Sequence, residues 1–119
     1  MSYDIELLDP VTKEVIELET PHQFKGGTYQ VGGSNLAELN ITYNYSTFYY
    51  KYICEKNGIR SLYGKTGKEC ISIISTAIQN LGSEPDEDYW NATPGNAGKA
   101  LQDLLTLIQK HPNCIVNGN

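Results

Sequence analysis

Three cations stand close to a predicted helix start between residues 58 and 69, and they form the clearest chemical pattern in the chain. They are Arg60, Lys65 and Lys68. Thr66, followed three residues later by a Glu, has the spacing of an N-terminal capping box. A helix N-terminus carries unpaired N–H groups and the positive end of the helix dipole, and both attract anions. We therefore predict that Arg60, Lys65, Thr66 and Lys68 bind a phosphate or a similar anionic group.

The same segment has two other interpretations. Gly64-Lys65-Thr66 has the ending of the nucleotide-triphosphatase loop, which also needs a Gly five positions before its second Gly. That position is Ile59, and Gly58 comes one residue too early, so the spacing argues against a triphosphatase. A capped helix with solvated lysines is the structural alternative to an anion site.

A tyrosine-rich stretch precedes the cations. The chain has nine Tyr against two Phe and one Trp, and five of the nine lie within ten residues. Tyr combines a flat apolar face with a polar tip, so it suits both base stacking and protein interfaces. We predict that Tyr49, Tyr52 or Tyr63 stacks on a base of the ligand. The alternative is that these rings, above all Tyr43 and Tyr45, belong to the core.

His22 and Tyr29 are two further candidates for the ligand-binding site. A general base needs a pKa near the working pH and a partner within reach. The sequence shows no obligatory partner for His22, so a structural or surface His is the alternative. Neither the two His nor the three Cys have metal-ligand spacing, and we expect no metal and no cofactor.

Charge is unevenly distributed along the chain. The net charge is −5, yet residues 51–68 hold five cations and one acid, and both flanking parts are acidic. Overall acidity makes duplex DNA an unlikely partner, since duplex binding depends on neutralising many phosphates. The acidic run 84–88 is predicted to be a solvated loop and not a calcium site, with Tyr89-Trp90 as an apolar anchor.

The sequence also bears on location. No apolar run approaches the roughly 20 residues that span a membrane, and the N-terminus lacks the basic and apolar regions of a signal peptide. Cys54, Cys70 and Cys114 are widely spaced, and we expect them to be reduced and mostly buried, with one disulfide as the alternative. We therefore expect a cytoplasmic protein without a membrane partner, and leave a homo-oligomer open.

Most strands are expected in the N-terminal half. Residues 3–8 and 15–19 alternate on either side of an Asp9-Pro10 turn and predict an opening β-hairpin. A short strand or a strand-like loop is expected at 28–31. The clearest alternation covers residues 36–46 and predicts a half-buried strand.

Helices are expected later in the chain. Residues 47–57 fit a helix capped by Ser46, or a continued strand because Tyr favours strands, and we prefer the helix. Further helices are predicted at 67–81, after the Thr66 cap, and from Thr93-Pro94 to His111-Pro112. Residues 114–119 are expected to be a short tail.

Strands first and helices later predict one α+β domain over residues 1–119. It would contain a small antiparallel sheet, made of the N-terminal hairpin plus one or two further strands, packed against two or three helices.

Several motifs together resemble a family of small proteins of phages and prophages of gut-type bacteria, for which no activity is settled. The resemblance covers nearly the whole chain, although the ending 115–119 departs from the Trp-Asp-Gly-Asp of relatives. It is carried by Tyr3-Asp4-Ile5, Asp9-Pro10-Val11-Thr12, Pro21-His22-Gln23, Gly26-Gly27-Thr28-Tyr29, Asn40-Ile41-Thr42-Tyr43-Asn44-Tyr45, Gly58-Ile59-Arg60-Ser61, Gly64-Lys65-Thr66-Gly67, Tyr89-Trp90 and Gly95-Asn96-Ala97.

Three functions follow as hypotheses. The first is a non-enzymatic phage-type binding protein that sequesters an anionic nucleotide-like ligand to counter host defence. The second is an interaction module or inhibitor of a host protein, using exposed Tyr and the acidic segments against a basic surface. The third is a small enzyme that acts on a nucleotide or nucleic acid through His22.

Overall fold

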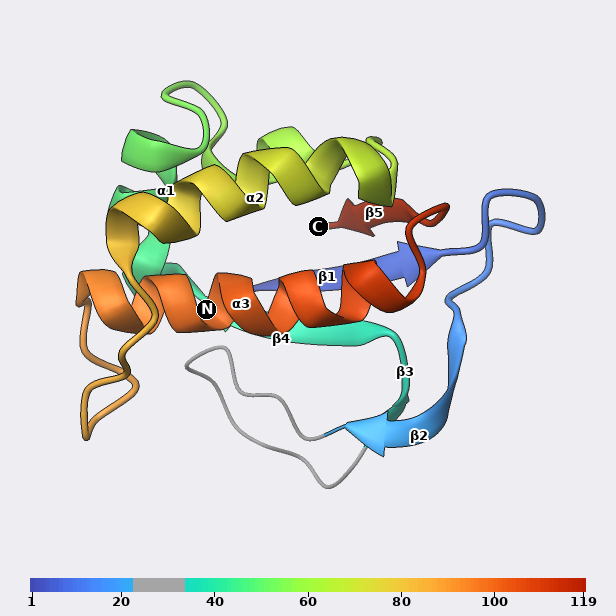
Figure 1. Cartoon of the computed structure of the whole chain (residues 1–119), viewed down its shortest axis with the longest axis horizontal. Coiled ribbons are helices and arrows are strands. Elements are labelled where there is room, and N and C mark those ends of the chain that lie inside the picture. Colours follow the sequence, from blue (N-terminus) through green and yellow to red (C-terminus); the bar gives the residue numbers. More distant parts are fainter. Residues whose placement is uncertain (23–33) are drawn as a thin grey trace.

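The computed structural model describes residues 1–22 and 34–119 (Figure 1). The short strand expected at 28–31 lies outside the described residues, as does Tyr29. The α+β prediction is confirmed, because a small antiparallel sheet packs against helices. The elements in chain order are β1 (Ser2–Leu8), β2 (Glu17–His22), β3 (Ser34–Leu36), β4 (Glu38–Thr42), the 3-10 helix η1 (Tyr43–Tyr45), α1 (Ser46–Tyr52), the 3-10 helix η2 (Gly58–Leu62), α2 (Gly67–Leu81), α3 (Pro94–Lys110) and β5 (Ile115–Gly118).

The main sheet has the strand order β4-β1-β5, and all its pairings are antiparallel. Strand β1 is central, with Ile5 opposite Leu39 on β4 and Leu7 opposite Val116 on β5. Side chains alternate between the two faces of a strand, so Tyr3, Ile5 and Leu7 of β1 are all buried. This face of the sheet meets the helices.

The predicted hairpin turn forms, but its second arm leaves the sheet early. Asp9 and Glu14 are joined by a main-chain hydrogen bond of 2.8 Å, and Leu8 forms a bridge with Val15. Strand β2 then turns away and pairs with β3 in a separate two-stranded sheet. Only Leu18 of β2 is buried, so β2 offers little apolar surface for the core.

Strands β4 and β5 occupy the two places beside β1. Both contribute buried apolar side chains, among them Ile41 and Val116. The prediction of a short tail at 114–119 was therefore wrong, because this segment contains strand β5. Its outer edge is covered by a preceding loop: Gly64 N–H donates to Val116 O, and Val116 N–H donates to Lys65 O.

The expected long strand at 36–46 is shorter than its pattern indicated. Strand β4 ends at Thr42, whose side chain accepts a hydrogen bond from Asn44 N–H, and η1 follows. Residues 47–57 are helical only as far as Tyr52. The Ser46 cap is a wrong prediction, since Ser46 is the first residue of α1 and its hydroxyl contacts the Tyr3 hydroxyl at 2.6 Å.

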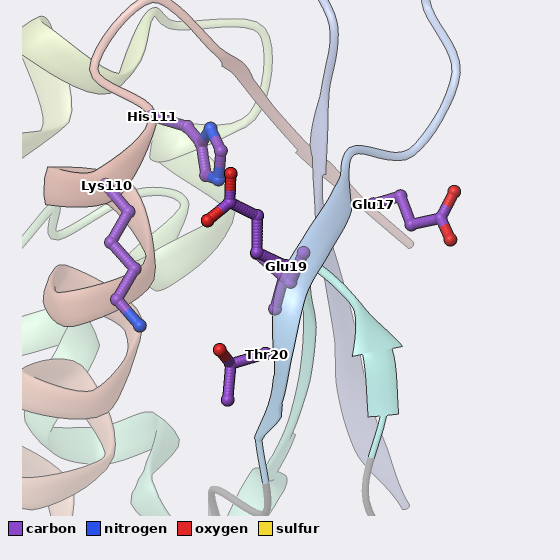
Figure 2. A pocket seen from close by; sticks show the side chains of 6 residues that line it. Glu17, Glu19, Thr20, Lys110 and His111 are labelled. Carbon is purple, nitrogen blue, oxygen red and sulfur yellow. The ribbon is translucent and has the colours of Figure 1, made fainter.

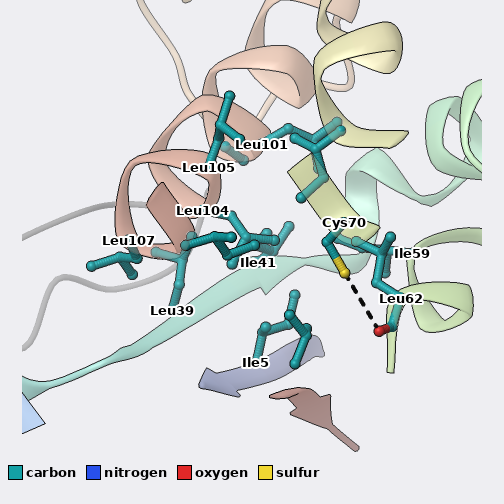
Figure 3. Packing of buried hydrophobic residues seen from close by; sticks show 14 of the residues in the cluster. Ile5, Leu39, Ile41, Ile59, Leu62, Cys70, Leu101, Leu104, Leu105 and Leu107 are labelled. Carbon is teal, nitrogen blue, oxygen red and sulfur yellow. Dashed lines mark hydrogen bonds between the residues drawn. The ribbon is translucent and has the colours of Figure 1, made fainter. Parts of the chain in front are cut away.

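Helices α2 and α3 begin and end where the sequence indicated. Thr66 and Glu69 form both bonds of the capping box, and Gly82 follows the last residue of α2 with φ 76°. Thr93 caps α3, with Pro94 at the first turn. The two helices pack against each other and against the sheet (Figures 1 and 3).

The core is one cluster of apolar side chains from every layer (Figure 3). Helix α3 contributes Leu101, Leu104 and Leu107, and the last two lie close to Leu39 and Ile41 of β4. Cys70 of α2 is also part of this cluster, and its thiol donates to Leu62 O at 3.8 Å. No helix in the described ranges combines the length and the apolar content needed to cross a membrane.

Gly98 permits the close approach of α3 to the end of α2. A Cβ atom at this position would overlap the main-chain oxygen of Gly82. Both partners in this contact are backbone, so no side-chain rotation could relieve the overlap.

We predict that Gly98→Ala lowers the free energy of unfolding by about 3 kcal/mol, because the two helices must separate. Urea unfolding followed by circular dichroism measures this value. Gln102→Ala, a half-exposed site on the same helix, serves as the control and should change it by less than about 0.5 kcal/mol. Equal stability of the two variants would show that the helices do not meet here.

Candidate functional site

The N-terminus of α2, where the sequence predicted an anion, has its N–H groups already occupied. All four N–H groups of residues 66–69 donate to acceptors within the chain. Thr66 N–H donates to Glu69 Oε1 (3.1 Å), Gly67 N–H to Cys114 O (2.8 Å), Lys68 N–H to Pro112 O (3.0 Å) and Glu69 N–H to Thr66 Oγ1 (3.3 Å). Any anion bound here must therefore depend on the side chains.

Arg60 contacts residues of β1, of η1 and of the segment after β5. Its guanidinium lies 4.8 Å from the ring centre of Tyr3 and 5.6 Å from that of Tyr43. It also donates to the Tyr43 hydroxyl at 3.0 Å and to the main-chain oxygen of Asn119 at 3.1 Å. These contacts give Arg60 a structural role, since it ties η2 to the start and the end of the chain.

Lys65 and Lys68 follow Arg60 at the start of α2, with Lys65 half-buried and Lys68 exposed. Within residues 1–22 and 34–119 the only ion pair joins Lys99 Nζ to Asp103 Oδ1 at 2.5 Å. The five cations of segment 51–68 therefore have no acidic partner in the described part of the chain. Because Arg60 is held by Tyr43 and Asn119, the charges at the start of α2 that remain available to a ligand are those of Lys65 and Lys68.

The three tyrosines proposed for base stacking lie in different surroundings. Tyr49 is fully buried and donates its hydroxyl to Ala97 O at 3.0 Å, so the prediction that it stacks on a ligand is wrong. Tyr52 is half-buried, with the ammonium of Lys51 5.2 Å from its ring centre. Tyr52 is thus the more accessible ring of the two.

Tyr63 is half-buried beside β5. Burial raises its pKa to about 12, and its hydroxyl has no hydrogen-bond partner among the described residues. A Cβ atom on Gly118 would lie 2.6 Å from this hydroxyl, so the ring packs directly on the main chain of β5. The Tyr63 hydroxyl therefore faces the protein and is not available to a ligand.

His22 ends strand β2, with its Nε2 atom 3.2 Å from Leu36 O. Asp103 is a buried acid of α3 whose pKa is raised by burial, while the charges of Lys99 and His22 lower it. Asp103 is therefore an acid that an enzyme acting through His22 could use. Its 2.5 Å contact with Lys99 already gives it a structural partner.

All three cysteines are free thiols, as predicted. Burial raises the pKa of Cys70 to about 11 and also raises that of Cys114. Cys54 is half-buried, and the N–H groups of Asn57 and Lys56 lower its pKa. No three His, Cys, Asp or Glu side chains of the described residues gather as a metal would require.

Residues 83–92, here called the acidic–aromatic loop, connect α2 to α3. The loop contains four acids and no Lys or Arg. The carboxylates of Glu84 and Glu87 are exposed and form no hydrogen bond or ion pair with described residues. Tyr89 and Trp90 stack with ring centres 5.9 Å apart and planes 27° apart, and Trp90 keeps 39% of its surface exposed.

A buried amide holds the acidic–aromatic loop in shape. Asn96 is only 3% exposed, and its Oδ1 accepts from Asp86 N–H at 2.8 Å. Its Nδ2 donates to Asp88 O at 3.0 Å and to Asn91 O at 2.9 Å. All three polar positions of this side chain are thus used to fix the loop backbone.

Two residues after β4 hold the other side of the loop. Asn44 Nδ2 donates to Trp90 O at 2.9 Å, and the Tyr45 hydroxyl donates to Tyr89 O. The anchors of Tyr89 and Trp90 are therefore their main-chain oxygens. The prediction of Tyr89-Trp90 as an apolar anchor is corrected on this point, because the Trp90 ring is exposed.

The ordering of this loop was not predicted from the sequence, although one residue could have indicated it. Asn96 stands beside Ala97 on the side of α3 that continues with Ala100 and Leu101, all buried. A polar amide on an apolar helix face must find hydrogen-bond partners. The polar loop that precedes α3 could supply them.

A cleft of about 440 Å³ lies between β2 and the C-terminal end of α3 (Figure 2). Its two sides carry opposite charges. The Glu19 carboxylate points toward the His111 ring, and the Lys110 side chain extends toward Thr20. The lining residues are Glu17, Leu18, Glu19, Thr20, Lys110 and His111.

Comparisons of the chain with protein-family models, with curated proteins and with solved structures return no match. The site must therefore be interpreted from its own chemistry.

We predict that Asn96→Ala lowers the free energy of unfolding by about 3 kcal/mol, because it removes three buried hydrogen bonds and leaves the Asp86 N–H without its partner. Hydrogen exchange of the amides of residues 84–92 should also become faster. Denaturant unfolding and exchange measured by mass spectrometry check both effects. Asn44→Ala, which removes a single exposed bond, is the control and should cost less than about 1 kcal/mol. Unchanged exchange in Asn96→Ala would mean that the loop is ordered by other contacts.

Proposed function

We propose that this protein is a non-enzymatic binding protein that docks on a basic surface of a partner protein through its acidic–aromatic loop. The observation that carries the proposal is Asn96, a buried side chain whose three hydrogen bonds all fix the backbone of that loop. The fold thus uses a buried polar group to order a surface segment that carries charge and an exposed Trp.

Ordering of the loop before binding supports this function. A surface loop that is already fixed loses less conformational entropy when a partner binds. Its carboxylates can attract a basic surface over roughly one Debye length, about 8 Å at physiological salt. Trp and Tyr are the side chains that most often carry binding energy at the centre of an interface. The loop therefore combines long-range attraction with short-range contact.

The partner is expected to be basic at the contact. The resemblance to small phage and prophage proteins makes a host protein the partner class we propose, and inhibition of that protein the consequence. A small enzyme acting through His22 has less support, because Asp103 is held by Lys99 at 2.5 Å.

We predict that a charge-reversed loop, Glu84→Lys/Glu87→Lys, lowers the affinity for the partner at least about tenfold. Trp90→Ala should lower it by a similar factor or more. The tagged full chain would capture the partner from a lysate of a gut-type bacterial host. Affinity of the purified pair would then be measured at several salt concentrations, and the wild type should bind more weakly as salt rises.

The matched control is Glu14→Lys/Glu55→Lys, which makes the same charge change at two exposed acids outside the loop. It should retain the affinity of the wild type within about twofold. Partner binding that is equally weakened in both double variants would assign the effect to net charge. Binding unaffected by either loop variant would refute the loop as the contact surface.

Sequestration of an anionic nucleotide-like ligand is the second candidate function. It is favoured by the cations of segment 51–68, which have no acidic partner among the described residues. Because the N–H groups at the start of α2 are occupied, Lys65 and Lys68 would bind the phosphate by their ammonium groups. Of the three tyrosines predicted to stack on a base, Tyr49 is buried and the Tyr63 hydroxyl faces the protein, so Tyr52 is the ring we propose for this contact.

We predict for this second function that calorimetry with a panel of cyclic nucleotides detects one ligand that is released unchanged. Lys65→Gln and Lys68→Gln should each weaken its binding by about tenfold, because each removes one charge from the phosphate. Lys110→Gln removes a cation elsewhere and should leave the binding constant unchanged. Absence of heat with every nucleotide would eliminate this function and leave docking by the loop untouched.

A further inference from the structure

We propose that the cleft between β2 and the C-terminal end of α3 binds a small zwitterion of the amino-acid type. The ammonium group of the ligand would lie at Glu19 and its carboxylate at Lys110 and Thr20. This site is separate from the acidic–aromatic loop, which precedes the opposite end of α3, and does not depend on the function proposed for it.

The two ends of the cleft carry complementary chemistry. At one end the Glu19 carboxylate points toward His111, and both side chains can accept a hydrogen bond there (Figure 2). At the other end the ammonium of Lys110 and the hydroxyl of Thr20 are donors. One end therefore suits a cation and the other an anion.

The opposite charges do not neutralise each other directly. In the described part of the chain no ion pair within 4.0 Å joins Glu19 to Lys110 or His111. The cleft that these residues line has a volume of about 440 Å³, which is within the range of small-molecule sites. Leu18, buried at this point of β2, anchors the strand that carries Glu19 and Thr20 in the core.

The arrangement selects for two charges of opposite sign on one ligand. A ligand with a single charge would pair with one end and would partly desolvate the other end without a partner. A zwitterion satisfies both ends at once, and its binding joins β2 to α3. Because the cleft is open and its charged groups are exposed, we expect affinities in the millimolar to high micromolar range.

Titration of the isotope-labelled full chain with the common L-amino acids tests this proposal by nuclear magnetic resonance. At least one should shift the amide signals of β2 and His111 saturably below about 10 mM. The N-acetyl and the methyl-ester derivatives of that amino acid each lack one charge. Each should bind at least about tenfold more weakly. Diglycine, which separates the charges further, distinguishes a free amino acid from a short peptide.

Variants of the cleft complete the experiment. Glu19→Gln and Lys110→Gln should each weaken binding by about tenfold or more, and Thr20→Val by a smaller factor. Glu14→Gln is the matched control, because Glu14 is an exposed acid before β2 that does not line the cleft, and it should bind as the wild type does. The proposal is overturned if no amino acid gives saturable shifts, if the singly charged derivatives bind equally well, or if Glu19→Gln has no effect. A loop variant such as Glu84→Lys/Glu87→Lys should bind the amino acid normally, so the two sites can be judged separately.

Discussion

The contact between α2 and α3 at Gly82 and Gly98 determines how the rest of the molecule packs. Two backbones meet there, and the helices approach more closely than any side chain at position 98 would allow. With its position set by α2, α3 packs beside α2 on one face of the sheet and buries Leu101, Leu104 and Leu107. The burial of about a dozen large apolar side chains supplies the main driving force for this arrangement. The surfaces proposed for binding are located by the two ends of this one helix.

The N-terminal end of α3 orders the acidic–aromatic loop, and the C-terminal end forms one wall of the cleft. In the first case the link is Asn96, whose amide reaches from the third position of α3 to three main-chain groups of the loop. In the second the link is Lys110 and His111, which follow the last buried turn and face β2. One helix therefore positions both proposed binding surfaces, the acidic–aromatic loop and the cleft.

Acidic and basic side chains are concentrated in different segments of the chain. The acidic–aromatic loop has four carboxylates and no cation, whereas segment 51–68 has a charge of +4. The ion pair of the described residues lies in neither segment, since it joins Lys99 to Asp103 within α3. Arg60 is the exception among the cations, because it stacks on Tyr3 and Tyr43 and binds the main chain of Asn119. Arg60 therefore has a structural role, because it links η2 to Tyr3 of β1 and to Asn119 after β5. Lys65 and Lys68 remain as the accessible charges at the start of α2.

Local features could be predicted well from the sequence. The limits of α2 and α3 depend on residues within a few positions of each other, such as Thr66 with Glu69 and Thr93 with Pro94. The inward face of β1 and the burial of Leu39 and Ile41 of β4 also follow from alternation alone. Contacts between distant segments could not be predicted in this way. Residues 114–119 have no strong pattern, yet β1 converts them into an edge strand, and Tyr49 enters the core because α3 covers it.

The sequence by itself determined the fold class, the caps and ends of the two long helices and the position of the basic segment. Each of these depends on side-chain chemistry or on interactions between near neighbours. Only the tertiary structure decided which charges are accessible. It occupied the N–H groups of Gly67 and Lys68 with carbonyls from the C-terminal segment, gave Arg60 a structural partner, and placed Asn96 under the acidic–aromatic loop. The physical reason is that hydrogen-bond partners far apart in sequence are chosen by packing, and packing is a property of the whole core.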